Sequence, residues 1–274
     1  MSENKPDIST KLPDFRTQKR VKRCLVLSLF RLLIFSLVST FHSCGFDVED
    51  PHKPSPPLWV EKSLPEEWPE RGIDAHESGG IFLEWEPDSS SAIVAHLIYR
   101  ARYYSFNDSL GDYSILSRVE SENTIGHSTI DASIESHAIY YYKLRAVHLS
   151  GIQSSFSDSI NFSVGRPINT KSMNPNGFND SLLFGQPLEW RNFYVNDVED
   201  YCLTILNMND NLQLRTILQP STYIDAQERW FPTDLVTLNP NEQYMWRIDV
   251  HNQYVAGIET SASESNWATF LYID

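Results

Sequence analysis

The feature that most constrains this chain is a hydrophobic strand pattern that occurs twice, about 105 residues apart. Leu83-Glu84-Trp85 returns as Leu188-Glu189-Trp190, and Tyr140-x-Tyr142-x-Leu144-x-Ala146 returns as Tyr244-x-Trp246-x-Ile248-x-Val250. Features so far apart keep nearly the same spacing when a whole unit has been duplicated. Short alternating segments separated by Gly, Asn, Asp, Ser and Pro are typical of β-sandwiches. The sequence therefore predicts an all-β fold with two tandem immunoglobulin-like sandwiches.

The first copy resembles a fibronectin type III domain. Trp85 matches the buried tryptophan of that family's second strand, and the run from Tyr140 to Val147 matches its sixth strand. The pair Pro56-Pro57 fits the position before the first strand. The resemblance implies that Tyr140 is the tyrosine-corner residue, whose hydroxyl bonds to backbone upstream.

The second copy is similar to the same family, although more loosely, through Trp190 and Tyr244. It is expected to be a fibronectin III-like or generic immunoglobulin-like sandwich. A large ring buries about 150–250 Å², and three cysteines do not make a disulfide framework. Hydrophobic packing must therefore stabilise both sandwiches, and Trp85, Tyr140, Trp190 and Tyr244 are expected to be structural core residues.

The first 44 residues carry charge of the opposite sign to the rest of the chain. They hold 8 Lys and Arg against 3 Asp and Glu, whereas residues 45–274 hold 14 bases against 33 acids. A basic run, Arg16 to Arg23, precedes an apolar run, Cys24 to Phe41. A basic flank followed by a short apolar run is typical of an export signal. Because the positive flank stays in the cytoplasm, the residues that follow are expected outside it.

The end of this apolar run resembles the lipobox of bacterial lipoproteins, with the small residue Ser43 directly before Cys44. The resemblance implies that Cys44 is the lipid attachment site and the first residue of the mature chain. Alternatively, residues 24–41 remain as an uncleaved membrane anchor, although Arg31 makes insertion costly, or the chain is secreted free. The expected location is the cell envelope, on the extracytoplasmic side of a membrane, at the outer membrane or cell surface.

These observations divide the chain into five segments. The expected segments are a lipoprotein-type signal over residues 1–44, a Pro-rich tether over 45–57, a fibronectin type III domain over 58–165, a linker over 166–179 and a second sandwich over 180–274. The tether contains four prolines, and Pro-rich chain is extended and semi-rigid. It would hold the sandwiches away from the membrane surface.

The composition and motifs exclude several functions. A net charge of −14, with no basic patch after residue 44, argues against a nucleic-acid partner. The chain has no HExxH zinc motif, no GxSxG elbow, no P-loop and no dinucleotide fingerprint. The sequence predicts no enzyme activity, no cofactor and no metal site. Acidic runs at 47–50, 197–200 and 207–211 lack EF-hand spacing and are expected to be solvated, with calcium as the alternative.

Two tryptophans, Trp68 and Trp230, fall outside the clean strand pattern. An exposed indole can stack on a sugar or anchor a partner, so both are possible ligand contacts, with local packing as the alternative. The expected function is that of a non-enzymatic, lipid-anchored cell-envelope protein whose sandwiches bind, adhere or act as spacers. The alternative is a carbohydrate- or polymer-binding accessory component of a surface uptake or degradation assembly. The partner would be a protein or a polysaccharide.

Overall fold

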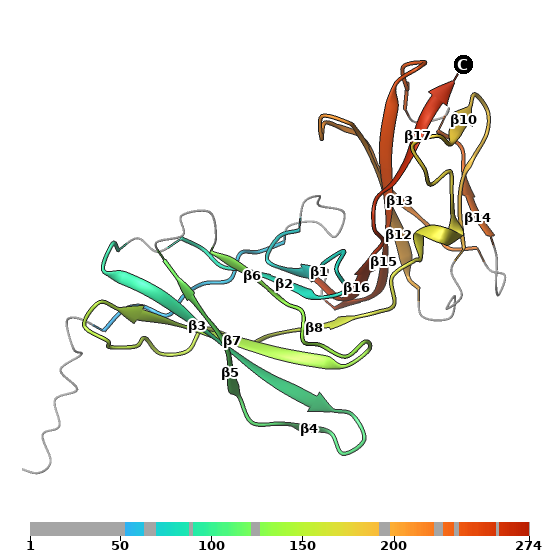
Figure 1. The fold of residues 1–274 in the computed structure, drawn as a ribbon. Helices are drawn as coiled ribbons and strands as arrows, with labels where there is room; N and C mark the ends of the chain where they lie inside the picture. The colour runs from blue at the N-terminus through green and yellow to red at the C-terminus, as the bar shows by residue number, and fades with distance from the viewer. Residues whose placement is uncertain are drawn as a thin grey trace, which may run out of the picture. The chain divides into compact units, whose positions relative to one another are not determined.

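In the computed structural model the chain forms two compact units, Met1–Pro51 and His52–Asp274. The second unit contains the strands that Figure 1 labels. Cys44 and Trp68 lie outside the residues that the structure describes, as does the segment expected to be a signal. The described residues are 53–62, 70–87, 90–121, 127–191, 198–221, 227–232, 236–255 and 258–273.

The first sandwich consists of two facing sheets. One sheet is antiparallel and has the order β1-β2-β6. The other has the order β8-β7-β3, with β5 pairing on β3 and the short β4 closing a hairpin with the end of β3. The strands are β1 (Ile73–Ala75), β2 (Ile81–Glu84), β3 (Ile93–Tyr104), β4 (Ser109–Leu110), β5 (Ser114–Glu120), β6 (Ser128–Asp131), β7 (Ile139–His148) and β8 (Ile160–Val164).

The second sandwich repeats this plan. A sheet with the order β14-β11-β9 faces strands β13, β12, β15 and β17, and β10 adds in parallel to the outer edge of β17. A short 3-10 helix, η1 (Thr170–Ser172), leads into β9. The strands are β9 (Met173–Asn174), β10 (Ser181–Leu183), β11 (Leu188–Arg191), β12 (Asp200–Asn207), β13 (Leu212–Leu218), β14 (Gln227–Trp230), β15 (Gln243–Val255), β16 (Ile258–Glu264) and β17 (Ala268–Ile273).

The two repeated sequence patterns occupy equivalent strands. Leu83 on β2 and Leu188 on β11 point inward in the smaller sheets, while the Tyr140 and Tyr244 runs form β7 and β15 in the larger ones. Inward residues alternate with outward ones on each of these strands because successive side chains of a strand point to opposite faces. The all-β fold class with two immunoglobulin-like sandwiches is confirmed.

Both cores are built on large rings. Trp85 and Trp190 are each 1% exposed, and each lies in the core of its own sandwich. The Tyr140 hydroxyl accepts a hydrogen bond from the backbone N–H of Glu135 at 3.0 Å, and the Tyr244 hydroxyl accepts one from Asn239 at 2.8 Å. Each sandwich therefore has a tyrosine corner that bonds backbone five residues upstream.

The second sandwich begins earlier than the sequence pattern indicated. Ile168 and Met173 are buried in its core, and Met173 pairs with Trp190 to add β9 to the sheet. Residues 166–179, which were predicted to be a linker, therefore include two residues of the second core. Strand β9 pairs with β11 on the side away from β14, and this pairing places Met173 in the core. The strand could not be predicted, because two residues are too few to show an alternating pattern.

One long hairpin connects the sandwiches. β15 pairs with β17 near its start and with β16 from Asp249 onward. β16 also pairs in parallel with β8, and the Gly165 N–H donates to the Ala262 carbonyl at 2.9 Å. The Ala262 side chain is fully buried and belongs to the core cluster of the first sandwich. The second sandwich thus contributes a residue to the first core. The aromatic rings of the two sandwiches nevertheless lie in two separate core clusters.

Candidate functional site

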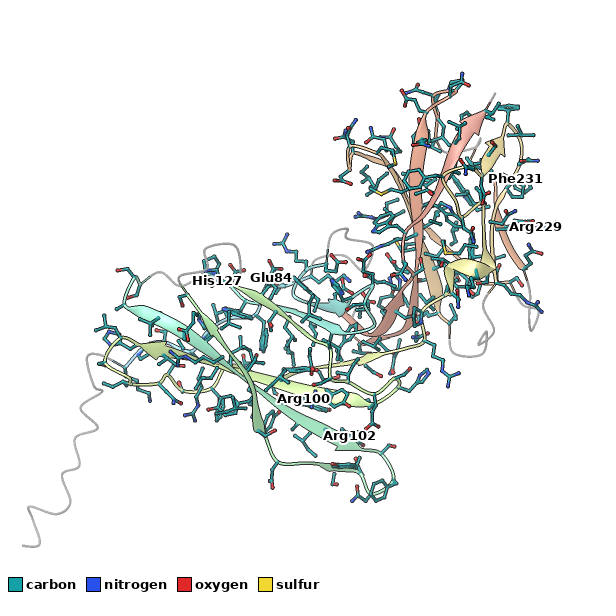
Figure 2. All side chains as sticks on the ribbon, in the orientation of Figure 1. Glu84, Arg100, Arg102, His127, Arg229 and Phe231 are labelled. Carbon is teal, nitrogen blue, oxygen red and sulfur yellow. The ribbon has the colours of Figure 1, made fainter. Side chains whose placement is uncertain are left out.

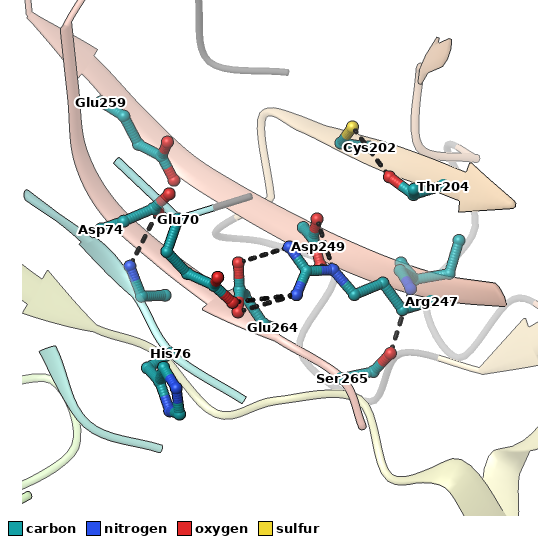
Figure 3. Close-up of polar contacts among 12 residues, drawn as sticks. Glu70, Asp74, His76, Cys202, Thr204, Arg247, Asp249, Glu259, Glu264 and Ser265 are labelled. Atoms are coloured by element: carbon teal, nitrogen blue, oxygen red, sulfur yellow. Dashed lines mark hydrogen bonds and ion pairs between the residues drawn. The ribbon is translucent and has the colours of Figure 1, made fainter. Parts of the chain in front are cut away.

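Charged side chains are buried where β15 and β16 meet the first sandwich (Figure 3). On β15, charged residues alternate with Trp246, Ile248 and Val250, which lie in the core of the second sandwich. The charged face of the strand is therefore turned away from that core. We call this group the junction cluster; its members are Lys62, Glu70, Asp74, Asp200, Arg247, Asp249, His251, Glu259 and Glu264.

Lys62 joins the two sandwiches through two carboxylates. Its Nζ lies 2.5 Å from Asp74 Oδ2 on β1 and 2.7 Å from Glu259 Oε2 on β16. All three side chains are less than a tenth exposed. Burial favours loss of the Lys62 proton, but the charges of Asp74 and Glu259 outweigh burial and raise the pKa of Lys62. Lys62 is therefore a permanent cation that links β1 to β16.

Arg247 is the second cation of the cluster. Its Nη2 donates to Glu264 Oε1 at 2.7 Å, and its Nη1 donates to Glu264 Oε2 at 3.1 Å and to Glu70 Oε1 at 3.2 Å. Its Nε donates to Asp249 Oδ2 at 3.2 Å. The planar guanidinium suits this use because its donors fork in fixed directions. Glu70 precedes β1, so Arg247 also bridges the two sandwiches.

His251 stands at the far end of the cluster, on the same face of β15. Its Nδ1 lies 2.6 Å from Asp200 Oδ1, and its Nε2 lies 3.8 Å from Glu259 Oε1. Burial by itself would lower the pKa of His251, but the hydrogen bond to Asp200 and the charges of Glu259, Asp200 and Asp249 raise it. The protonated form of this histidine is therefore favoured.

The cluster contains more acid than base. Six carboxylates face two permanent cations, Lys62 and Arg247, together with His251. Burial raises the pKa of Glu259 to about 7, and Asp74 adds to the effect. Burial also raises the pKa of the carboxyls of Asp74, Asp249 and Glu264. The arrangement can therefore hold protons as well as ion pairs.

The ion pairs of this site join residues of the two sandwiches. Cys202 lies nearby on β12, but burial raises the pKa of its thiol, so it is not a reactive thiolate. Across the part of the chain that the structure describes, no group of three or more His, Cys, Asp or Glu residues could hold a metal ion. Within the same residues, no helix is long and apolar enough to cross a membrane.

The structure corrects one residue predicted to contact a ligand. Trp230 is only 9% exposed and lies in the core of the second sandwich. Trp230 is therefore a core ring, because it ends β14 with its side chain turned toward β11 and the facing sheet. Its neighbour Phe231 is 46% exposed and is the ring on the surface at this point (Figure 2).

Sequence reasoning missed the junction cluster. The acidic run 197–200 was expected to be solvated, but Asp200 is bonded to His251. A usable signal exists: Arg247, Asp249 and His251 place three ionisable groups on one face of a strand whose other face is hydrophobic. Such a face needs partners if it is covered. The partners Lys62 and Glu70 are nearly two hundred residues away in sequence and carry no local signal.

A second group of side chains lies on the outer face of the first sandwich's larger sheet. We call it the cation–aromatic row; its members are Tyr99, Tyr113, Lys143, Arg145 and Phe156. The Arg145 guanidinium carbon lies 3.8 Å from the centre of the Phe156 ring, and Lys143 Nζ lies 4.6 Å from that of Tyr113. Within the described ranges, neither cation forms an ion pair with a carboxylate.

Comparisons with known proteins give no family. No protein-family model matches the chain, and no curated protein matches it. Among solved structures, the FN1–FN3 domains of chicken CNTN1 are similar at 13% identity and a TM-score of 0.33, covering 80% of this chain and 69% of that chain. The twitchin kinase region from C. elegans is 15% identical with a TM-score of 0.30, and covers 42% of this chain. The present chain spans 17% of that twitchin structure.

A third similar structure is pectate lyase PelI from Erwinia chrysanthemi in complex with tetragalacturonic acid. It is 15% identical with a TM-score of 0.26, covering 40% of this chain and 38% of that chain. The assignment of the fold does not depend on these similarities. It follows from the strand order of each sandwich and from the two tyrosine corners of this chain.

Proposed function

We propose that the chain is a non-enzymatic, lipid-anchored module of a bacterial cell envelope, in which two coupled sandwiches act as a spacer that presents a binding surface away from the membrane. The observation that carries this proposal is the connection between the sandwiches. Strand β16 pairs with β8, and Lys62 and Arg247 bond carboxylates of both halves. A spacer of this kind needs its domains joined rather than loosely tethered.

The energetics of buried ions support a role in specifying one arrangement. Replacing a buried ion pair by hydrophobic residues is often neutral or stabilising. The junction cluster is therefore not explained by stability alone. Buried ion pairs are costly to break one partner at a time, so they penalise a wrong docking of the two sandwiches more than a hydrophobic contact does.

The coupling is tested by calorimetry on the full chain in detergent at mildly acidic pH. We expect the second unit to unfold in a single cooperative transition, because the second sandwich supplies Ala262 to the first core. Two transitions that respond separately to Leu144→Ala in the first core and Ile205→Ala in the second would contradict a coupled spacer.

The anchor is tested by mass spectrometry of protein extracted from membranes. We expect a mature chain that begins at an acylated Cys44, and we expect Cys44→Ser to remain unprocessed. Cys202→Ser is the matched control, because this thiol is buried on β12 and should not affect processing. Recovery of the wild-type chain with residues 1–43 attached would favour an uncleaved anchor.

A second candidate function, binding of an acidic carbohydrate polymer, is supported by the cation–aromatic row. The sandwiches are otherwise acidic, yet Lys143 and Arg145 stack on rings without a carboxylate partner among the described residues. Rings can stack on sugars and cations can bind carboxylates. In affinity electrophoresis through polygalacturonate, retardation abolished by Lys143→Ala with Arg145→Ala, but retained in Arg118→Ala, would favour this function. Unretarded wild-type protein would exclude this polymer.

A further inference from the structure

We propose that the junction cluster is a proton-operated latch: the contact between the two sandwiches is tight while the cluster holds protons and loosens when it loses them. The inference rests on the proposed coupling of the sandwiches and adds a condition under which that coupling changes. It follows from the composition of the cluster, its burial and its position across both halves.

Ionisable groups face the cluster from every element packed around it, and acid exceeds base. Within the junction cluster, six ionised carboxylates face two permanent cations, which leaves four negative charges uncompensated when His251 is neutral and three when it is protonated. Uncompensated buried charge is costly, and protons relieve it. The facing groups are Lys62 and Glu70 before β1, Asp74 on β1, Asp200 and Cys202 on β12, Arg247, Asp249, His251 and Tyr254 on β15, and Glu259 and Glu264 on β16.

Glu259 is the group whose protonation controls the latch. Its Oε2 accepts from Lys62 at 2.7 Å, so it is part of the bridge to the first sandwich. Its Oε1 is buried, accepts no hydrogen bond within the described residues, and faces His251 Nε2 at 3.8 Å. A proton on either Glu259 or His251 reduces the repulsion between Glu259 and Asp74, which share Lys62.

The direction of the pH response follows from the two groups. In open water a glutamic acid titrates near 4.3 and a histidine near 6.5, whereas in the closed junction the pKa of Glu259 is raised to about 7 and that of His251 is also raised. The closed junction therefore binds protons more tightly than the open one. For Glu259, closure strengthens as pH falls from about 7 toward its ordinary value. For His251, closure is strongest below its ordinary value and weakens as pH rises through the raised one.

The hydrogen bond from the Gly165 N–H to the Ala262 carbonyl reports on closure because it crosses the junction. Hydrogen exchange of the full chain in detergent, read in peptides of β8 and β16, measures its protection. Between about pH 6 and pH 8 we expect protection there to fall about tenfold or more after correction for the intrinsic rate. Peptides of β3 and β17, which carry core residues of the two sandwiches and no member of the cluster, should keep their protection.

Glu259→Gln tests the assignment, since the amide keeps the shape but cannot titrate. We expect this variant to lose most of the pH response, and His251→Gln to lose part of it. Glu135→Gln is the matched control, because Glu135 pairs with Arg102 at an exposed position and forms no ion pair with the cluster among the described residues, and it should respond like the wild type. A wild-type response that is absent or reversed, or one that Glu259→Gln retains in full, would overturn the latch.

Three further outcomes separate the latch from its alternatives. Junction peptides that are unprotected at every pH would contradict the coupling itself, and with it both proposals. High protection at every pH would contradict the latch and leave the coupled spacer intact. If millimolar calcium restores protection at about pH 8, a metal cation rather than protons neutralises the cluster, and the proton latch is overturned.

Discussion

At the scale of the residue, Tyr140 and Tyr244 each serve two purposes. Their rings lie in the cores of the two sandwiches. The Tyr140 hydroxyl accepts a hydrogen bond from the Glu135 N–H, and the Tyr244 hydroxyl accepts one from the Asn239 N–H. A backbone donor next to a packed ring loses access to water, so the hydroxyl replaces a solvent partner. The tyrosine corner thereby ties the turn before the strand to the strand itself.

Removal of one hydroxyl isolates this contribution. Tyr140→Phe keeps the ring but leaves the Glu135 N–H without its acceptor. We expect the first sandwich to lose about 1–3 kcal/mol of unfolding free energy, measured as a shift of the urea midpoint. Tyr141→Phe is the control, since Tyr141 points to the outer face, and its midpoint should match that of the wild type. Equal midpoints for Tyr140→Phe and the wild type would contradict the role of the corner.

Replacement of Arg247 should lower the free energy of unfolding by more than removal of the Tyr140 hydroxyl, because it leaves buried carboxylates unpaired. Arg247→Met removes the donors to Glu264, Asp249 and Glu70 while keeping a long apolar stem. We expect a loss of about 3–5 kcal/mol at neutral pH. Arg118→Met removes an exposed ion pair with Glu120 and should cost at most about 1 kcal/mol. Similar urea midpoints for the two variants would contradict the burial of the cluster.

Asp131 makes the stability of the first sandwich depend on pH in the acid range. Burial opposes its ionisation, but hydrogen bonds from Arg100, Tyr142 and Ser133 outweigh burial and lower its pKa. Its contribution is therefore present above its ordinary value and lost as pH falls through the lower value of the folded state. We expect Asp131→Asn to be less stable at neutral pH and to lose less stability below about pH 4. The control Asp210→Asn, in a turn of the second sandwich, should follow the wild-type curve in urea titrations.

At the scale of the element, β16 shows where sequence prediction succeeds and where it stops. The strands around Trp85, Trp190, Tyr140 and Tyr244 could be predicted, because alternation and repeated spacing are local properties of the chain. The parallel pairing of β16 with β8 could not, since it involves two residue pairs about a hundred positions apart. The short β9 was missed for the related reason that two residues carry no periodicity. The junction cluster follows from these long-range pairings, so it was missed as well.

Ala262 is the residue through which this pairing is most easily disturbed. Its side chain is fully buried in the first core, so Ala262→Leu must displace its neighbours. We expect a loss of about 1–3 kcal/mol from overpacking and a faster exchange of the Gly165 amide. Asn266→Leu places the same side chain at an exposed position just after β16 and should leave both measurements unchanged. Unaltered exchange in Ala262→Leu would show that β16 does not hold the junction.

At the scale of the whole molecule, charge is the dominant property. The chain carries a net charge of −14, and most of its basic residues outside the first 44 form ion pairs or stack on rings. Like charges distributed over a folded surface repel one another and favour expansion. The same repulsion opposes the association of one copy of the protein with another.

Salt should therefore stabilise the folded chain, although it weakens individual exposed ion pairs. Raising sodium chloride from about 0.02 to about 0.3 M shortens the Debye length well below the size of a domain. We expect the urea midpoint to rise with sodium chloride. Sodium nitrate at an equal ionic strength should give a similar rise. A midpoint that falls with salt would indicate that exposed ion pairs outweigh the general repulsion.

The placement of Cys202 has a consequence for damaged copies of the molecule. Its sulfur is buried beside Thr204 on the face of β12 that is turned away from the second core and toward the junction cluster, so oxidants and other thiols reach it only after this region opens. In an oxidising medium, a molecule that unfolds would be captured by cross-linking or sulfenic acid formation, whereas its intact neighbours would be spared. Loss of structure would thus leave a chemical mark on the sulfur that persists until a reductant removes it.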